Sequence, residues 1–464
     1  LSELAQAVNA GLVPQASQLL IGGATADGQV IDFQASCIET ARRNNRLLRE
    51  WRASWLELVK ASLTLTPWTA DAHRDSFRFW ADQGVAALAP ENFFWANAGA
   101  VKRFFDTNGE SLANGYANWL RDVQRPNGLP MTADLGDLQI GRDLAATPGA
   151  VVYRNRLLEL IQYAPTTDTV HQIPIVFIPP WINKYYILDL TPANSMMAWL
   201  RDQGFLVFTV SWKNPGVEMR DVGFEDYVFR GALEAVQVVR EITQQKAVHA
   251  VGFCIGGTAL ATLMGWLAHP SANGGEKSAD SPVAHWTLLA TLVDFCNPGE
   301  LGLLADEKSL PLVEALMDRQ GFLDGSVVEA VFRLLRSESL IWHPAIRNYL
   351  YGDAPARSEV LYWNSDSARL PRRMLSFYLK EFYVNNQLVT EEGLVINGRR
   401  VHLRDIPQPL YAVGCIQDHI VPWMQVMRIR DLLNGQVRYA LSSEGHIAGI
   451  LNPPTTKSRR RFWV

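Results

Sequence analysis

The 464-residue sequence has few cysteines, little net charge and no long hydrophobic run. The four cysteines (Cys37, Cys254, Cys296 and Cys415) show neither C-x-x-C pairing nor disulfide-dense spacing, which favours a reducing, cytosolic compartment. A net charge of −4 argues against a general nucleic-acid binder. No apolar run is long enough to span a bilayer, so we expect no transmembrane segment.

The sequence also has no metal-ligand cluster and no glycine loop for a nucleotide, so we expect neither a metal nor another cofactor. It begins with Leu1 and lacks the basic start of a signal peptide, so we expect a processed or incomplete chain. Its length favours two or three structural units over a single core.

The hydrophobic pattern changes near residue 146. Residues 1–145 are predicted to be mainly helical, with an amphipathic run from Glu39 to Leu65. From residue 146 onward, short apolar strands alternate with helices, which predicts an α/β fold with a doubly wound, mostly parallel sheet. The expected strands are residues 151–153, 157–163, 173–178, 205–210, 248–253, 285–292, 409–416 and 437–441.

The predicted domains follow from this change and from one long insertion. A helical N-terminal domain covers residues 1–145, and the two parts of the α/β core cover 146–297 and 406–464. Between them, residues 298–405 are far longer than the crossover that a doubly wound sheet needs. We expect this insertion to be a cap over the catalytic face, which excludes water from the reaction. The alternative is a helical layer that faces away from the site.

The most specific motif joins the strand 248–253 to a helix. Its tight turn, with Cys254 between Gly252 and Gly256, predicts a nucleophile elbow with cysteine in place of serine. Side chains at the two glycines would collide with the neighbouring strand and helix. The N-terminus of the following helix favours a thiolate. The alternative is a buried core cysteine before a glycine-rich turn.

An acid and a histidine follow Cys254 in the chain order of α/β hydrolases. Asp418 comes after the strand 409–416, and His446 comes after the strand 437–441. We therefore predict a catalytic triad of Cys254, Asp418 and His446. Asp294, which also follows a strand, is the competing acid, and His419 is the competing histidine.

The remaining candidates are expected to have structural roles. His249 lies within the elbow strand and is predicted to be a core histidine. Cys296 and Cys415 are predicted to be packing thiols, because neither lies in a turn of the elbow type.

Over about residues 70 to 463 the sequence resembles the polyhydroxyalkanoate synthases, especially those of class I. The motifs that carry the resemblance are Gly252-Phe253-Cys254-Ile255-Gly256-Gly257-Thr258, Pro179-Pro180-Trp181-Ile182-Asn183-Lys184-Tyr185-Tyr186-Ile187-Leu188-Asp189-Leu190, Ser211-Trp212-Lys213-Asn214-Pro215, Tyr362-Trp363-Asn364-Ser365-Asp366, Asp418-His419-Ile420-Val421-Pro422 and Gly445-His446-Ile447-Ala448-Gly449. The resemblance implies an α/β-hydrolase fold and an acyltransferase that polymerises (R)-3-hydroxyacyl-CoA, with 3-hydroxybutyryl-CoA as the expected substrate. It also implies a homodimer in the cytoplasm, at the surface of polyester granules.

The implied mechanism uses a covalent acyl-cysteine on Cys254. His446 takes the proton of the thiol and later that of the incoming 3-hydroxyl group, while Asp418 orients His446 or acts on the hydroxyl more directly. The backbone amides of Ile255 and Ile182 are expected to hold the oxyanion. Lys380 is the candidate for binding the CoA phosphates, because the family often has arginine there.

Two other functions compete with the synthase. A cysteine-dependent thioesterase or polyester depolymerase would use the same triad but release free monomer. A non-catalytic granule scaffold would retain only the fold, although intact Cys254, Asp418 and His446 argue against such decay.

Overall fold

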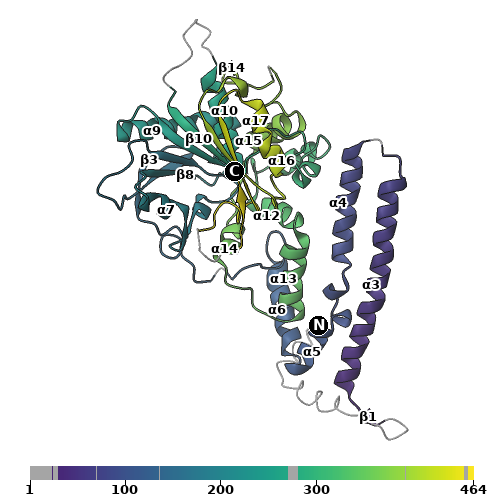
Figure 1. Ribbon diagram of the computed structural model, residues 1–464. Coiled ribbons are helices and arrows are strands. Elements are labelled where there is room, and N and C mark those ends of the chain that lie inside the picture. Colours follow the sequence, from purple (N-terminus) through teal and green to yellow (C-terminus); the bar gives the residue numbers. More distant parts are fainter. Residues whose placement is uncertain are drawn as a thin grey trace. The chain divides into compact units, whose positions relative to one another are not determined.

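The predicted strands form one large sheet. The computed structural model describes residues 23–24, 30–68, 70–134, 136–269, 281–391, 393–453 and 458–464, and within these ranges the sheet has the strand order β17-β16-β15-β10-β9-β5-β8-β4-β3 (Figure 1). Its strands are β3 (Gly149–Arg154), β4 (Leu158–Tyr163), β5 (Ile175–Ile178), β8 (Val207–Trp212), β9 (Val248–Phe253), β10 (Val283–Leu289), β15 (Leu410–Cys415), β16 (Val437–Ser442) and β17 (Phe462–Trp463).

The middle of this sheet is parallel, as predicted. The strands from β8 through β5, β9, β10 and β15 to β16 pair in parallel, whereas β3–β4, β4–β8 and β16–β17 are antiparallel. All four residues of β5 are buried, as are five of the six in β9. Parallel strands that are covered on both faces form such continuous apolar runs. The elbow strand β9 is therefore in the interior of the sheet.

Helices and short strand pairs connect and extend these strands. The helices are α7 (Met196–Asp202), α8 (Phe224–Asp226), α9 (Glu234–Thr243), α10 (Ile255–Ala268), α11 (Leu310–Met317), α12 (Gly325–Leu334), α14 (Glu359–Ser365), α15 (Arg372–Phe377), α16 (Trp423–Met427) and α17 (Ile429–Leu432). The two-residue pairs β11 (Phe322–Leu323) with β12 (Leu370–Pro371) and β13 (Val395–Ile396) with β14 (Arg399–Arg400) lie in the segment predicted as a cap. The sequence pattern did not predict these pairs or β17, because two residues are too few for a periodic signal.

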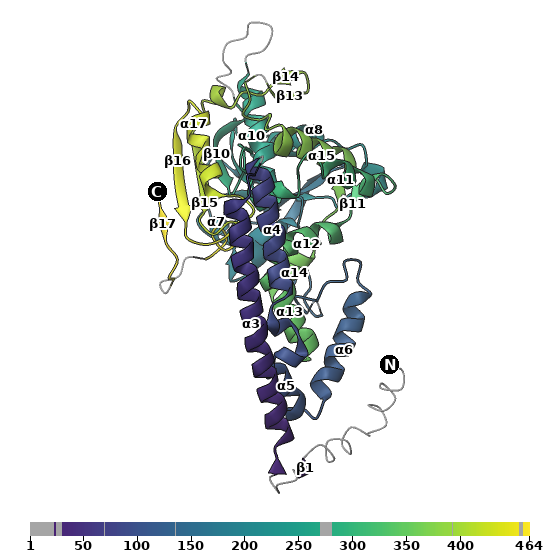
Figure 2. The ribbon, with the colours of Figure 1, turned by 90° about the vertical axis from the view of Figure 1, so that its right-hand side faces the viewer.

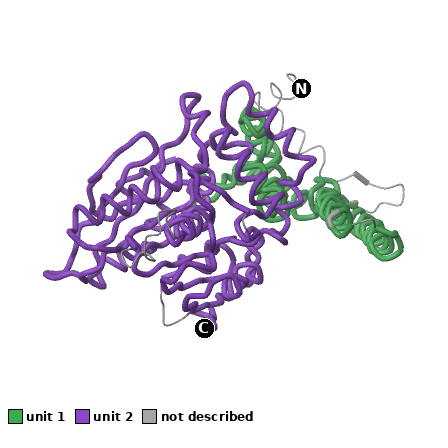
Figure 3. Tube along the Cα trace, turned by 90° about the horizontal axis from the view of Figure 1, so that it is seen from above, with its two compact units in different colours: residues 1–135, 329–358 green, residues 136–328, 359–464 purple. Residues whose placement is uncertain are grey.

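The chain divides into two units. Residues 1–135 and 329–358 form one, and residues 136–328 and 359–464 form the other (Figure 3). The sequence predicts residues 329–358 as part of the cap, but in the structure they pack with the N-terminal helices. Gly115 in α6 (Glu110–Val123) allows this packing, because a Cβ atom there would lie 1.9 Å from the Tyr349 carbonyl oxygen. The buried Arg333 guanidinium also donates to the Pro130 carbonyl at 2.6 Å.

The described residues of the first unit are mainly helical. Its helices include α3 (Phe33–Leu65), α4 (Asp71–Ala87), α5 (Ala98–Asp106), α6 and α13 (His343–Ala345), with the π-helical turns Glu338–Trp342 and Ile346–Leu350 beside α13. The helix α3 begins six residues before the predicted start because the Asp32 carboxylate accepts a hydrogen bond from the Ala35 amide at 2.9 Å.

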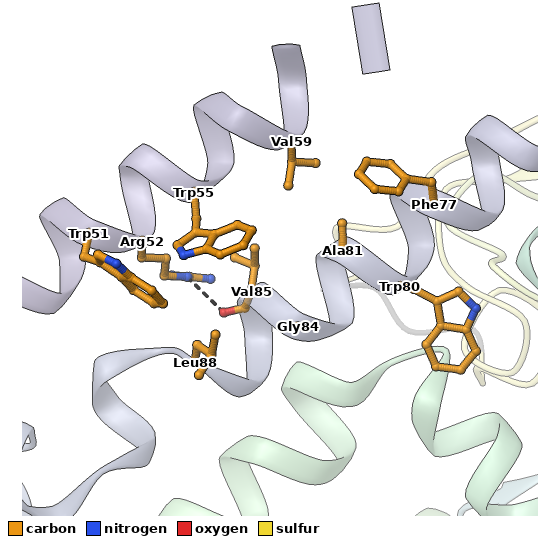
Figure 4. Close-up of a pocket in the computed structure, with 10 residues that line it drawn as sticks. All are labelled: Trp51, Arg52, Trp55, Val59, Phe77, Trp80, Ala81, Gly84, Val85 and Leu88. Atoms are coloured by element: carbon orange, nitrogen blue, oxygen red, sulfur yellow. Dashed lines mark hydrogen bonds between the residues drawn. The ribbon is translucent and has the colours of Figure 1, made fainter. Parts of the chain in front are cut away.

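An apolar groove lies between α3 and α4, which run side by side (Figures 2 and 4). Its lining consists of Trp51, Arg52, Trp55, Val59, Phe77, Trp80, Ala81, Gly84, Val85 and Leu88. The Arg52 Nε atom donates a hydrogen bond to the Val85 carbonyl oxygen at 3.1 Å. The guanidinium is therefore directed at the backbone of α4 and not into the groove. None of the described helices is long and apolar enough to cross a membrane.

Candidate active site

Cys254 lies in the turn between β9 and α10. Its backbone has φ 52° and ψ −125°, which is strained for a residue with a side chain. The flanking glycines make this turn possible. A Cβ atom at Gly252 would lie 2.4 Å from the Gly257 Cα atom, and one at Gly256 would lie 2.2 Å from the Ile178 carbonyl oxygen. Cys254 is partly buried and packs against the hydrophobic core of the second unit.

Asp418 and His446 meet at the same edge of the sheet. The loops after β15 and β16 carry them, and His446 Nδ1 lies 2.7 Å from Asp418 Oδ2. The other carboxylate oxygen of Asp418 accepts hydrogen bonds from the amides of Ile420 and Val421, at 2.9 and 2.8 Å. The imidazole stacks on the ring of Phe253, the residue before Cys254, with 5.3 Å between ring centroids. The carboxylate thus orients the histidine toward the elbow.

The electrostatics of the site favour a charged histidine. Burial by itself lowers the pKa of His446, but the charges of Asp418 and Cys254 and their hydrogen bonds to the imidazole raise it to about 10. An imidazolium beside a thiolate is the activated state of a cysteine nucleophile. The arrangement therefore suits nucleophilic attack by Cys254 on a carbonyl carbon.

The competing acid, Asp294, has other partners. Asp294 is buried and accepts hydrogen bonds from the Cys296 amide, from Asn386 and from Arg428. These contacts place Asp294 in a hydrogen-bond network separate from the Asp418–His446 pair. One of its partners, Asn386, belongs to the segment predicted as a cap. His419 is partly exposed, and Asp418 lies within hydrogen-bond distance of His446.

The other candidate residues, His249, Cys415 and Cys296, differ in their solvent exposure. His249 is partly buried in β9, where burial and the neighbouring His285 ring lower its pKa. Cys415 is buried as expected, and burial, with Asp418 nearby, raises its pKa to about 12. The prediction that Cys296 is a packing thiol is wrong, because Cys296 is exposed. It follows β10 in a loop rather than in a packed strand.

The two amides expected to bind the oxyanion lie in neighbouring segments. Ile255 is the first residue of α10, where an N–H group has no intrahelical acceptor. Ile182 lies in the loop after β5. A Cβ atom at Gly256 would lie 2.2 Å from the Ile178 carbonyl oxygen, so α10 closely approaches the end of that strand. The Ile182 carbonyl accepts a hydrogen bond from the Ala368 amide at 2.8 Å. This loop is therefore tied to the segment predicted as a cap.

Two tyrosines of that segment lie near Cys254, although no motif in the sequence predicts a role for them. Burial raises the pKa of Tyr378 and Tyr383, and the charge of the Cys254 thiolate raises both further. They lie five residues apart in the π-helix Tyr378–Val384, with 5.8 Å between their rings. A π-helix brings residues i and i+5 together, whereas the spacing of an α-helix does not. Lys380, in the same turn, is exposed and lies 3.9 Å from Glu381.

An elbow nucleophile, with an acid and a histidine after later strands of a mostly parallel sheet, defines an α/β-hydrolase fold. In agreement, residues 173–453 match the family described as alpha/beta hydrolase fold. Residues 41–200 match the family described as Poly-beta-hydroxybutyrate polymerase (PhaC) N-terminus.

Individual relatives show which family within the α/β-hydrolase fold this chain belongs to. The chain is 37% identical over 435 residues to the poly(3-hydroxyalkanoate) polymerase of Methylorubrum extorquens, covering 93% of this chain and 69% of that protein. It is 38% identical over 401 residues to the poly(3-hydroxyalkanoate) polymerase subunit PhaC of Cupriavidus necator, covering 85% of this chain and 66% of that protein. The chain belongs to the poly(3-hydroxyalkanoate) polymerase family, and it spans about two thirds of the length of these relatives.

Proposed function

We propose that this chain polymerises (R)-3-hydroxyacyl-CoA into polyhydroxyalkanoate and releases CoA, with 3-hydroxybutyryl-CoA as the expected substrate. The observation that carries the proposal is the strained Cys254 beside the His446–Asp418 pair. Membership of the polymerase family gives this triad its reaction. A thiolate exchanges acyl groups with a CoA thioester near thermoneutrality, because one thioester replaces another.

The first step loads the enzyme. The Cys254 thiolate attacks the thioester carbonyl, a carbon–sulfur bond forms and the carbonyl electron pair moves onto oxygen. The amides of Ile255 and Ile182 hold this oxyanion. The intermediate collapses when the bond to the CoA sulfur breaks, and CoA leaves with the proton that His446 holds.

The second step extends the polymer. The 3-hydroxyl oxygen of another hydroxyacyl group attacks the acyl-Cys254 thioester, and His446 takes the hydroxyl proton. An ester bond forms, and the Cys254 sulfur leaves as a thiolate. Asp418 keeps the imidazole in the orientation that both steps need. The CoA thioester is a substrate, so the proposed reaction requires no cofactor or metal.

The proposed partners follow from the reaction and the family. The growing polyester and the granule surface are the apolar partners, and a homodimer in the cytoplasm is the proposed assembly. The parts of the predicted cap that belong to the second unit, residues 298–328 and 359–405, act as the cap over Cys254, and the position of Tyr378 and Tyr383 near the sulfur supports this. Exclusion of water by this cap would protect the acyl-cysteine from hydrolysis.

Incubation with 3-hydroxybutyryl-CoA tests the proposal when CoA release and polymer are both measured. We expect CoA release that accompanies insoluble polyester. Release of CoA together with free 3-hydroxybutyrate would instead support a thioesterase. Absence of both products, with a Cys254 that does not react with thiol reagents, would support a non-catalytic scaffold.

A further inference from the structure

Hydrogen bonds from outside the loop after β5 hold the segment that carries Ile182. The Trp212 indole Nε1 donates to the Pro179 carbonyl at 2.8 Å. The Trp363 indole Nε1 donates to the Lys184 carbonyl at 2.7 Å. These two bonds hold the loop at positions three residues before and two residues after Ile182, and the Ala368 amide donates to Ile182 itself at 2.8 Å.

Trp212 holds the loop from the core. It is the last residue of β8 and is 9% exposed. Its ring packs against Trp181 and Tyr227, with centroid distances of 5.4 and 5.1 Å. A Cβ atom at Gly231 would lie 2.6 Å from this ring, so the glycine leaves room for the indole. The donor that meets the Pro179 carbonyl is thus fixed by packing on several sides.

Trp363 holds the loop from the insertion. It lies in α14 and is 5% exposed. Beyond it, Asn183 and Ser367 form an isolated antiparallel bridge, and the Tyr186 hydroxyl donates to Asp366 at 2.8 Å. Residues 363–368 therefore lie against the loop, and a single antiparallel bridge between Asn183 and Ser367 joins the two segments.

We propose that Trp212 and Trp363 are positioning residues that keep the Ile182 amide directed at the oxyanion. The inference rests on the proposed acyl transfer. It predicts that the oxyanion hole is complete only while residues 363–368 are seated on the loop, so closure of the insertion and stabilisation of the transition state occur together. Neither indole takes part in forming the thiolate, which depends on His446 and Asp418.

Phenylalanine substitutions test the inference, because they retain a ring but remove the N–H donor. Trp212→Phe and Trp363→Phe should each lower kcat by roughly 10- to 100-fold, since small misplacements of reacting groups cost this much. KM for 3-hydroxybutyryl-CoA should change by less than about 3-fold, and alkylation of Cys254 by iodoacetamide should keep its rate and pH profile.

Trp286→Phe is the matched control. This indole is 1% exposed and donates to the Gln408 carbonyl at 3.1 Å, before the first residue of β15 and thus at the end of the sheet away from Asp418. The control should lose a comparable hydrogen bond and lower the melting temperature without a selective fall in kcat.

These measurements distinguish a failure of the positioning role from a failure of the proposed function. If the unmodified chain releases no CoA from 3-hydroxybutyryl-CoA, the proposed function fails. If it is active and both Trp212→Phe and Trp363→Phe keep their kcat, or lose no more than Trp286→Phe, the positioning role is wrong. Failure of both variants to fold would also overturn it, because the indoles would then support the fold rather than the reaction.

Discussion

His446 Nδ1 and Asp418 Oδ2 lie 2.7 Å apart, and backbone amides hold the other oxygen of the same carboxylate. The carboxylate therefore cannot turn away from the ring without losing those bonds. In Asp418→Asn the amide group would no longer support a protonated imidazole. We predict a fall in kcat of roughly 10²- to 10⁴-fold, by analogy with the orienting acid of other triads. Steady-state CoA release measures it.

Asp294→Asn is the control for this prediction. Asp294 pairs with Arg428 and Asn386, so its loss should lower thermal stability more than the rate of CoA release. An inactive Asp294→Asn with a nearly normal Asp418→Asn would reassign the catalytic acid.

The raised pKa of His446 has a consequence for stability. The folded chain binds this proton more tightly than the unfolded chain, in which the pKa is near 6.5. The contribution of His446 to stability is therefore full below pH 6.5 and is lost as the pH rises through about 10. We predict that the difference in unfolding free energy between the unmodified chain and His446→Gln shrinks from pH 7 to pH 10. Denaturant titrations at several pH values measure it.

Cys254→Ala provides the control, because it removes one of the two negative partners of His446. In the Cys254→Ala protein, the stabilisation that His446 provides should be lost at a lower pH than in the unmodified chain. A difference that is constant across this range would show that His446 is not charged in the folded chain.

The close approach of α10 to β5 predicts that Gly256→Ala is severely damaging. Its Cβ atom would lie 2.2 and 2.6 Å from the carbonyl oxygens of Ile178 and Pro179, which belong to the backbone and cannot rotate away. Both stability and CoA release should fall. Gly84→Ala is the matched control, because no atom lies within 4 Å of its Cβ position in α4. It should stabilise the helix by about 1 kcal/mol. Thermal unfolding of both variants checks this, and a stable, active Gly256→Ala would contradict the elbow packing.

The sequence was most informative where a residue type and a strand end occur together. Cys254, Asp418 and His446 each follow an apolar strand, and parallel strands bring such positions to one edge of the sheet. The flanking glycines were also predictable, because the turn leaves no space for side chains.

Long-range packing was not predictable in the same way. The attachment of residues 329–358 to the N-terminal helices depends on the contact of Gly115 with the Tyr349 carbonyl, which has no local signature. The pairing of Tyr378 with Tyr383 depends on a π-helix, which the α-helical period of the sequence pattern does not predict.

Lys380 stays a prediction that a substitution can test. Its side chain is exposed in the same turn as Tyr378 and Tyr383, so it can meet a charged group of a bound substrate. Lys380→Ala should raise KM for 3-hydroxybutyryl-CoA about 3- to 10-fold, while Cys254 alkylation stays normal. Lys246→Ala, at an exposed lysine before the start of β9, is the matched control and should change neither. Equal effects of the two substitutions would remove Lys380 from the substrate site.

The most direct test of the account is to locate the acyl group during turnover. After rapid acid quench of a reaction with 3-hydroxybutyryl-CoA, peptide mass spectrometry should find the hydroxybutyryl group on Cys254. The adduct should be absent from Cys254→Ala, which should also release no CoA because the remaining thiols lack the histidine and the strained turn. An acyl group on another residue, or undiminished polymer synthesis by Cys254→Ala, would contradict the account.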